Sequence, residues 1–314
     1  MALTWLGVGR YTVGIAPYQQ PVLIYNPAAG QLRRNPERIL QRTTEALARA
    51  SLRPRLAPTS GPGDATEIAR RAVADGADLI IALGGDGTIN EAVNGMVHSQ
   101  ATLGILPAGT ANVLAMELGL GSRLGRAING LVGCVERRVA LGKLCNGGSA
   151  GRHFLAMAGA GLDAKIVYDL DPELKAQAGK LSYWLAGFGH VTQRVAQCEA
   201  SIDGQKYRAG FVLTSRVRNY GGDLEIASGA SLLRDDFEVV IFEGSNPLRY
   251  LWYMAGVATK TVQKMSGVHT LRARNVSLTG DVHVQVDGEY AGRLPAHFEI
   301  VPAALTLLVP PNYG

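Results

Sequence analysis

The chain has few of the residues that stabilise small secreted folds or stack on nucleic-acid bases. Only three of its 314 residues are cysteines, and aromatic residues make up 6%. An odd number of scattered cysteines gives no disulfide framework and indicates a reducing compartment. The basic residues are not interleaved with stacking aromatics, so we expect no nucleic-acid partner.

Long apolar runs and the commonest nucleotide motifs are also missing. No run approaches the roughly 18 apolar residues of a membrane-spanning helix. Residues 1–20 lack a basic start before a continuous apolar block, so we expect an N-terminal extension there and no secretory leader. Neither a GxxxxGKS/T P-loop nor a GxGxxG dinucleotide fingerprint occurs. The first absence excludes a P-loop protein, and the second argues against a dehydrogenase.

The overall composition is that of a folded chain with a basic surface. Hydrophobic residues make up 47% and charged residues 18%, enough to bury the cores of two domains. The net charge of +5 favours anionic partners, such as nucleotide phosphates or an acidic membrane surface.

Residues 21–142 are predicted to form an α/β domain. Asn35 before Pro36 predicts a helix start, and Asp64 with Glu67 has the spacing of a capping box. Alternating strands and helices imply right-handed crossovers and a Rossmann-like doubly wound sheet. Apolar runs typical of its buried strands occur at Val22–Tyr25, Asp78–Leu83 and Leu103–Leu106.

Residues 143–314 are predicted to form an antiparallel β-sandwich, with the last strand returning to the first domain. Apolar residues alternate in Val282–Asp287, as in a strand with one buried face. Helical stretches are expected near 181–193 and Pro247–Lys264, and the aromatic run Tyr250–Met254 suits either the core or a bilayer surface. Further strands are predicted at Phe211–Ser215, Phe237–Phe242, Val276–Leu278, Phe298–Val301 and Leu305–Val309.

A glycine-rich turn follows the most apolar run of the chain. The segment LIIALGGDGTINEAVNG, Leu79–Gly95, predicts a buried strand, a turn over Gly84–Gly87 and a helix that starts near Thr88. Backbone amides and the positive end of the helix would then point at one place, where a phosphate can bind. Asp86 lies in this turn, and a carboxylate beside phosphates indicates a shared Mg²⁺ or proton handling.

Three other loops are expected at the same edge of the sheet. LPAGTANVLA, Leu106–Ala115, repeats the strand–glycine–helix pattern one crossover later, and the other two loops are Asn26–Gly30 and Thr59–Asp64. An ordinary turn would explain any one of them. Together they predict a nucleotide site, because ligands bind at the carboxyl ends of the strands in open α/β sheets.

Two carboxylates flank a glycine at the end of an alternating strand, Asp287-Gly288-Glu289. A hairpin turn with solvated acids would account for this pattern. Phosphoryl transfer, however, needs a carboxylate that orients or deprotonates the acceptor hydroxyl. Asp287 and Glu289 are therefore candidates for that role together with Asp86, and the sequence leaves open which acid is the base.

At these motifs the sequence resembles the diacylglycerol kinase catalytic superfamily, which includes sphingosine kinases and soluble bacterial lipid kinases. The resemblance runs from about residue 20 to the C-terminus. GGDGT is shared with NAD kinases, so the pieces of the second half favour the lipid branch. The matching pieces are NPAAG, GGDGTINEAVNG, LPAGTANVLA, LAMAGAGLDAKIV, KLSYW, NYGGD and VQVDGEY.

The resemblance implies ATP and Mg²⁺ in a cleft between the domains. It implies that Asp163 reaches the acceptor head group, that Asp287 and Glu289 supply the catalytic base, and that Asp86 acts through Mg-ATP. Asp235 would be a ligand of a structural Mg²⁺, although the surrounding residues depart from the family pattern. The implied nucleotide contacts are Asn26, Thr59, Gly84, Gly85, Asp86, Gly87, Thr88, Asn90, Gly109, Thr110 and Asn112.

The leading hypothesis is an ATP- and Mg²⁺-dependent kinase that phosphorylates a hydroxyl of diacylglycerol, a sphingoid base or a related lipid. Two alternatives stay open: an NAD kinase or other small-molecule kinase, and a non-catalytic nucleotide-binding regulatory protein. We further expect a cytoplasmic location with peripheral contact at the inner membrane face, and a homodimer.

Overall fold

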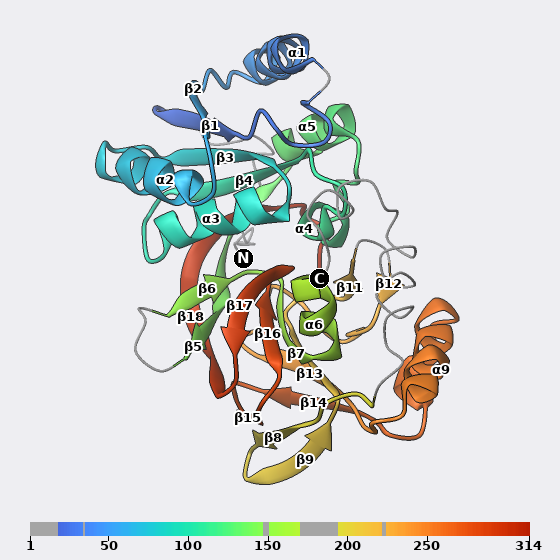
Figure 1. Cartoon of the computed structure of the whole chain (residues 1–314). Coiled ribbons are helices and arrows are strands. Elements are labelled where there is room, and N and C mark those ends of the chain that lie inside the picture. The colour runs from blue at the N-terminus through green and yellow to red at the C-terminus, as the bar shows by residue number, and fades with distance from the viewer. Residues whose placement is uncertain (1–17, 34, 147–150, 170–193, 222–223) are drawn as a thin grey trace, which may run out of the picture.

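The computed structural model describes residues 18–33, 35–146, 151–169, 194–221 and 224–314. It consists of an α/β domain with a parallel sheet, followed by an antiparallel β-sandwich domain (Figure 1). The predicted fold class is therefore confirmed. The helix expected near 181–193 lies outside the described residues. Among the described helices, none combines the length and apolar composition needed to cross a bilayer.

The first domain is a parallel sheet with strand order β2-β1-β3-β4, covered by helices. Its strands are β1 (Pro21–Tyr25), β2 (Arg55–Pro58), β3 (Leu79–Gly84) and β4 (Thr102–Pro107). Its helices are α1 (Pro36–Arg49), α2 (Asp64–Ala74), α3 (Asp86–Met96), α4 (Val113–Glu117) and α5 (Leu124–Val132). Helix α2 packs on α3, and α1 packs on α5 (Figure 1). Every residue of β3 and β4 is buried, which explains why all of them except Thr102 lack a polar side chain.

The start of α1 is the one predicted from sequence. The side chain of Asn35 accepts a hydrogen bond from the backbone N of Arg38 at 3.1 Å, and Pro36 occupies the first helical position. An asparagine cap with a proline at the first position satisfies one amide of the first turn and removes another.

The capping box predicted at the start of α2 is wrong. Gly63 is the N-cap residue, with φ 86°, and no side chain caps it locally. Asp64 instead accepts hydrogen bonds from the loop before the helix, and Glu67 pairs with an arginine one turn on. The carboxylate of Glu91, on α3, accepts from the amides of Gly63 at 2.8 Å and Ala65 at 3.1 Å. Glu91, on another helix, therefore satisfies amides that a local cap would otherwise satisfy.

The second domain packs two sheets face to face. The six-stranded antiparallel sheet has the order β14-β13-β10-β7-β16-β17, and the other layer is formed by β5, β6, β15, β8, β9 and β18. Phe154, Phe237 and Phe298 meet between the layers, with ring centroids 5.7 and 6.1 Å from Phe154. Among the described residues, the helices beside these sheets are α6 (Leu162–Asp169), α9 (Pro247–Ala258) and the 3-10 helix η1 (Val262–Lys264). The strands are β5 (Val135–Cys145), β6 (Arg152–Phe154), β7 (Met157–Gly161), β8 (Cys198–Ile202), β9 (Gln205–Ala209), β10 (Phe211–Ser215), β11 (Asn219–Tyr220), β12 (Leu224–Glu225), β13 (Phe237–Phe242), β14 (Val268–Ala273), β15 (Asn275–Gly280), β16 (His283–Val286), β17 (Glu289–Arg293) and β18 (Ala296–Val309).

The last strand, β18, links the two domains. Two separate strands were predicted here, but a single strand runs through both and is irregular only between Val301 and Leu305. Pro302 has no N–H to donate at that point, so the register shifts without ending the strand. β18 pairs antiparallel with β15 and β5 and parallel with β4 of the first domain. One sheet therefore runs through the whole molecule.

Candidate active site

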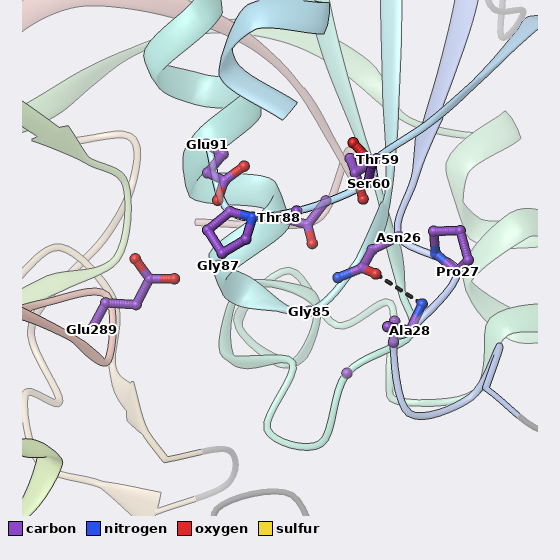
Figure 2. A pocket seen from close by; sticks show the side chains of 14 residues that line it. Asn26, Pro27, Ala28, Thr59, Ser60, Gly85, Gly87, Thr88, Glu91 and Glu289 are labelled. Atoms are coloured by element: carbon purple, nitrogen blue, oxygen red, sulfur yellow. Dashed lines mark hydrogen bonds between the residues drawn. The ribbon is translucent and has the colours of Figure 1, made fainter. Parts of the chain in front are cut away.

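A cavity of about 590 Å³ lies at the carboxyl edge of the parallel sheet (Figure 2). This volume is within the range of about 300–1,000 Å³ that is usual for small-molecule sites. Four loops of the first domain form most of its wall, and Glu289 of the second domain closes one side. The described residues that line it are Asn26, Pro27, Ala28, Ala29, Thr59, Ser60, Gly61, Pro62, Gly85, Gly87, Thr88, Glu91, Gly109 and Glu289.

Two glycine turns touch each other at the floor of the cavity. A Cβ atom added to Gly109 would lie 2.6 Å from the Cα of Gly85, and the amide of Ala108 donates to the carbonyl of Gly84 at 2.8 Å. Only glycine allows this approach. Gly85 is also the N-cap of α3, so the N-terminus of an 11-residue helix opens into the cavity. Amides and helix dipole there favour an anion such as a phosphate.

The loops after β1 and β2 are held by backbone and side-chain hydrogen bonds. Asn26 folds over its own loop, where its Oδ1 accepts from the amide of Ala28 at 2.9 Å (Figure 2). The amide of Thr59 donates to the carbonyl of Tyr25 at 2.9 Å. The amide of Gln31 donates to the carbonyl of Ala108 at the same distance. These hydrogen bonds hold the polar edge of the cavity in place.

Asp86 joins the starts of α3 and α4. Its Oδ1 accepts from the amide of Leu114 at 3.3 Å. Burial raises the pKa of Asp86 above its ordinary value, and hydrogen bonds from the amides of Val113 and Leu114 oppose the rise. Asn112 fixes the turn beside it with φ 50°, because its side chain both accepts from the amide of Gly109 and donates to its carbonyl, each at 2.8 Å.

Asp287 is anchored on all sides in the turn between β16 and β17. Its carboxylate accepts from the amides of Leu155, Ala156 and Met157 at 3.2, 3.2 and 2.8 Å. The amide group of Asn90, on α3, donates to Oδ2 at 2.5 Å, which ties the turn to the first domain. Burial raises the pKa of Asp287 to about 6, and the amide hydrogen bonds oppose this rise.

Glu289 leaves the same turn but points into the cavity (Figure 2). A Cβ on Gly87 would come within 2.6 Å of its Oε1, so the carboxylate lies against the glycine turn of the first domain. Its Oε2 accepts a hydrogen bond from Nη2 of Arg152 at 2.5 Å. The Glu289 side chain is 43% exposed, and that of Arg152 is 31% exposed. Two domains therefore meet at one carboxylate.

Asp163 is buried behind the turn that carries these acids. It accepts hydrogen bonds from the hydroxyl of Tyr220 and from Nε2 of Gln285, the latter at 2.9 Å. Oε1 of Gln285 accepts in turn from the amide of Gly288 at 2.8 Å. This chain of contacts can hold the Asp287–Glu289 turn in place.

The structure brings together part of the predicted nucleotide set. Arg152 and Glu91 were not among the predicted residues. Glu91 directly follows Asn90 in the glycine-rich segment, so its position was a usable signal, whereas Arg152 lies in none of the motifs singled out in the sequence. Predicted residues that line the cavity are Asn26, Thr59, Gly85, Gly87, Thr88, Gly109 and Glu289; those behind or beside it are Gly84, Asp86, Asn90, Thr110, Asn112, Asp163 and Asp287.

The surroundings of Asp235 are held by arginines. Its carbonyl accepts from Nε of Arg274 at 3.1 Å. Nearby, the fully buried guanidinium of Arg216 donates to the carbonyls of Leu232 and Arg234 at 2.8 and 2.7 Å, and burial lowers its pKa to about 10. Within the described part of the chain, no three His, Cys, Asp or Glu side chains gather to hold a metal ion. A metal role for Asp235 stays a prediction.

Two family models cover most of the sequence. Residues 20–144 match the diacylglycerol kinase catalytic domain, and residues 156–309 match the YegS C-terminal NAD kinase beta sandwich-like domain. The first match contains the four loops of the cavity, and the second contains Asp163, Asp287 and Glu289.

Curated relatives and solved structures agree with these matches. The chain is 30% identical over 290 residues to a diacylglycerol kinase of Bacillus subtilis (strain 168), covering 88% of this chain and 91% of that protein. It is 29% identical over 286 residues to one of Staphylococcus aureus (strain bovine RF122 / ET3-1), covering 88% of each. A crystal structure of a diacylglycerol kinase from Bacillus anthracis str. Sterne superposes with a TM-score of 0.76 at 25% identity, covering 95% of this chain and 99% of the other. A second structure from that organism reaches a TM-score of 0.81 at 24% identity, covering 96% and 99%, and supports the fold alone.

Proposed function

The chain belongs to the diacylglycerol kinase family, and on that premise we propose that it transfers the γ-phosphate of ATP to a hydroxyl group of a lipid. One observation carries the proposal. Glu289, from the β-sandwich, lies against the glycine turn at Gly87 at the N-terminus of a helix. A phosphate-binding helix end and a carboxylate from the opposite domain are the two parts that phosphoryl transfer to a hydroxyl needs.

In this proposal the first domain holds ATP. The amides of Gly85, Gly87 and Gly109 bind the phosphates, and the loops at Asn26 and Thr59 hold the rest of the nucleotide. Thr88 also lines the cavity, and the remaining predicted contacts would support these turns, namely Gly84, Asp86, Asn90, Thr110 and Asn112. Mg²⁺ usually takes one or two carboxylates beside phosphate oxygens, and Asp86, at the start of α3, is the acid that would take this role. The ion would neutralise charge on the phosphates.

The acids of the second domain have different roles. Asp287 has its carboxylate occupied by three amides and Asn90, which suits an anchor for the turn. Glu289 lines the cavity, where a bound acceptor would lie, and this position suits the base that takes the hydroxyl proton. Asp163 positions the turn through Gln285.

A phosphorylation assay with labelled ATP and separate acceptors tests this function. Vesicles that contain diacylglycerol or a sphingoid base, and NAD in solution, would each be incubated with the protein and Mg²⁺. We expect labelled phospholipid and no labelled NADP. Label only in NADP would support a small-molecule kinase instead, and binding of ATP without transfer to any acceptor would support a regulatory protein.

We also propose peripheral contact with an anionic bilayer through the outer face of α9. Leu248 is 70% exposed and Trp252 49% exposed, and Leu251 lies on the same face. The helix carries no acid, and Arg249 and Lys260 lie at its two ends, which suits an acidic lipid surface. A contact of this kind would agree with the predicted location at the inner membrane face. Flotation with anionic vesicles would test the contact, and a protein that stays in the unbound fraction would contradict it.

A homodimer remains a prediction, and light scattering would test it.

A further inference from the structure

The cavity wall carries acids but no cation among the described residues that form it. Its only charged members are Glu91 and Glu289. Glu91 is already committed, because its carboxylate accepts from two amides at the start of α2. A triphosphate brings several negative charges, and enzymes that transfer phosphoryl groups offset them with metal ions and basic side chains. A basic side chain that contacts one of these acids would offset the charge of the phosphates.

Arg152 is that side chain. It begins β6, and its Nη2 lies 2.5 Å from Oε2 of Glu289 and 3.4 Å from Oδ1 of Asn90. Glu289 in turn touches the glycine turn at Gly87, so the guanidinium is one side chain away from the phosphate-binding helix end. Within the described residues, the side chain of Arg152 makes two hydrogen bonds, and both come from Nη2. The N–H groups on Nε and Nη1 can then each donate a charge-assisted hydrogen bond to a phosphate oxygen.

We propose that Arg152 is a catalytic residue that contacts the transferred phosphoryl group while Glu289 takes the proton of the acceptor. This assignment rests on the proposed function. The acceptor oxygen forms a bond to the γ-phosphorus, and the bond to the β–γ bridging oxygen breaks with its electron pair left on ADP. The hydroxyl proton goes to Glu289. Arg152 offsets the charge on the γ-phosphoryl oxygens and holds Glu289 at the correct edge.

The role predicts a preference for triphosphate over diphosphate that depends on Arg152. Binding of Mg²⁺ with a non-hydrolysable ATP analogue, and with ADP, would be measured by calorimetry for the wild type and Arg152→Gln. We expect the variant to bind the analogue at least about tenfold more weakly and ADP within about twofold. We also expect kcat to fall by about 10³-fold or more, with partial rescue by added methylguanidinium. Arg152→Lys keeps the charge without the fork and should lie between the two.

Arg293 provides the matched control. It lies on β17, the strand that carries Glu289, and pairs with the exposed Asp281 at 2.6 Å. Arg293→Gln should leave both affinities and kcat unchanged. An equal loss of analogue and ADP affinity in Arg152→Gln, or full activity of that variant, would overturn the proposal. If the wild type phosphorylated no lipid but still preferred the triphosphate through Arg152, the proposed acceptor would be wrong and the role of Arg152 would stand.

Discussion

At the scale of single residues, two carboxylates one glycine apart occupy different environments. Asp287 has φ 49° and a carboxylate surrounded by four donors, whereas Glu289 lies in the cavity with Arg152 as its partner. Desolvation raises the pKa of Asp287 and hydrogen bonds oppose the rise. Glu289, in contrast, lines the cavity where an acceptor would bind. We therefore propose Asp287 as the anchor and Glu289 as the base, two roles that the sequence left open.

Glu289→Gln tests the base. Gln keeps the size and the polarity but cannot accept a proton, so kcat should fall by about 10²–10⁴-fold. Binding of the ATP analogue and the thermal midpoint should change little, because the side chain is partly exposed. Glu199→Gln is the control, since Glu199 forms an exposed pair with Lys206 on the outer strands of the sandwich. Turnover above half the wild-type value in Glu289→Gln would remove the residue from the chemistry.

The raised pKa of Asp287 predicts a pH dependence of turnover. The ionised carboxylate accepts the hydrogen bonds that hold the turn, so kcat should rise with pH through about 6 and then level off. The folded-state pKa lies above the ordinary 3.8, so folding takes up a proton between these values. This group's contribution to stability is present below pH 3.8 and is lost as pH rises through 6.

Initial rates at saturating substrates between pH 5 and 8 provide the measurement for this dependence. Asp287→Asn should show low activity without the step near pH 6. A wild-type rate that is flat from pH 5 to 7 would contradict the role given to Asp287.

The site residues that the sequence predicts are those that stand in short motifs. Glycines at strand ends, Asp86 and the pair Asp287 and Glu289 stand in short motifs whose chemistry follows from neighbouring residues. Arg152 and the buried partners of Asp163 could not be found this way, because their contacts join positions more than fifty residues apart. Such pairs become visible only when the fold brings them together.

At the scale of elements, the paired glycine turns determine the floor of the cavity. The two turns approach so closely that a methyl group at Gly109 would meet the backbone of Gly85 at 2.6 Å. The backbone of Gly85 cannot rotate away from an added methyl group, as a flexible side chain could. The spacing of the two turns, and therefore of their amides, depends on the missing Cβ.

Gly109→Ala should push these turns apart. We expect a loss of about 1–3 kcal/mol in the free energy of unfolding from overpacking, and nucleotide affinity at least about tenfold weaker. Gly61→Ala is the matched control, because Gly61 also lines the cavity but a Cβ there meets no atom within 4 Å. Urea unfolding and calorimetric titration measure both effects. Equal behaviour of the two variants would show that the turn contact does not govern binding.

Elements were predicted well where the local signal was strong. The largely apolar strands β3, β4, β10 and β13 follow from hydrophobicity, and the cap of α1 follows from an Asn-Pro pair. The start of α2 was misjudged because Glu91, on another helix, satisfies its amides. The sequence predicts two strands where the structure has the single strand β18. Pro302 interrupts the run of strand-forming residues but does not end the strand.

At the scale of the whole molecule, β18 makes the two domains share one sheet. Its pairing with β4 on one side and with β5 and β15 elsewhere means that neither domain closes its sheet alone. Long-range pairing of this kind carries no local sequence signal.

This shared sheet predicts that both domains unfold together. Calorimetry should give one transition whose calorimetric and van't Hoff enthalpies agree. Leu307→Ala, at a fully buried position of β18 paired with Leu103, should cost about 2–5 kcal/mol and shift that transition without splitting it. Two resolved transitions, in the wild type or in the variant, would contradict the coupling.

The central claim is that amides at the two glycine turns hold the phosphates while Glu289 approaches from the other domain. The most direct test is a crystal structure with Mg²⁺ and a non-hydrolysable ATP analogue. Our account predicts phosphate oxygens within hydrogen-bond distance of the amides of Gly85, Gly87 or Gly109, with the terminal phosphate nearest Glu289. A nucleotide bound elsewhere, or with its terminal phosphate turned away from Glu289, would contradict it.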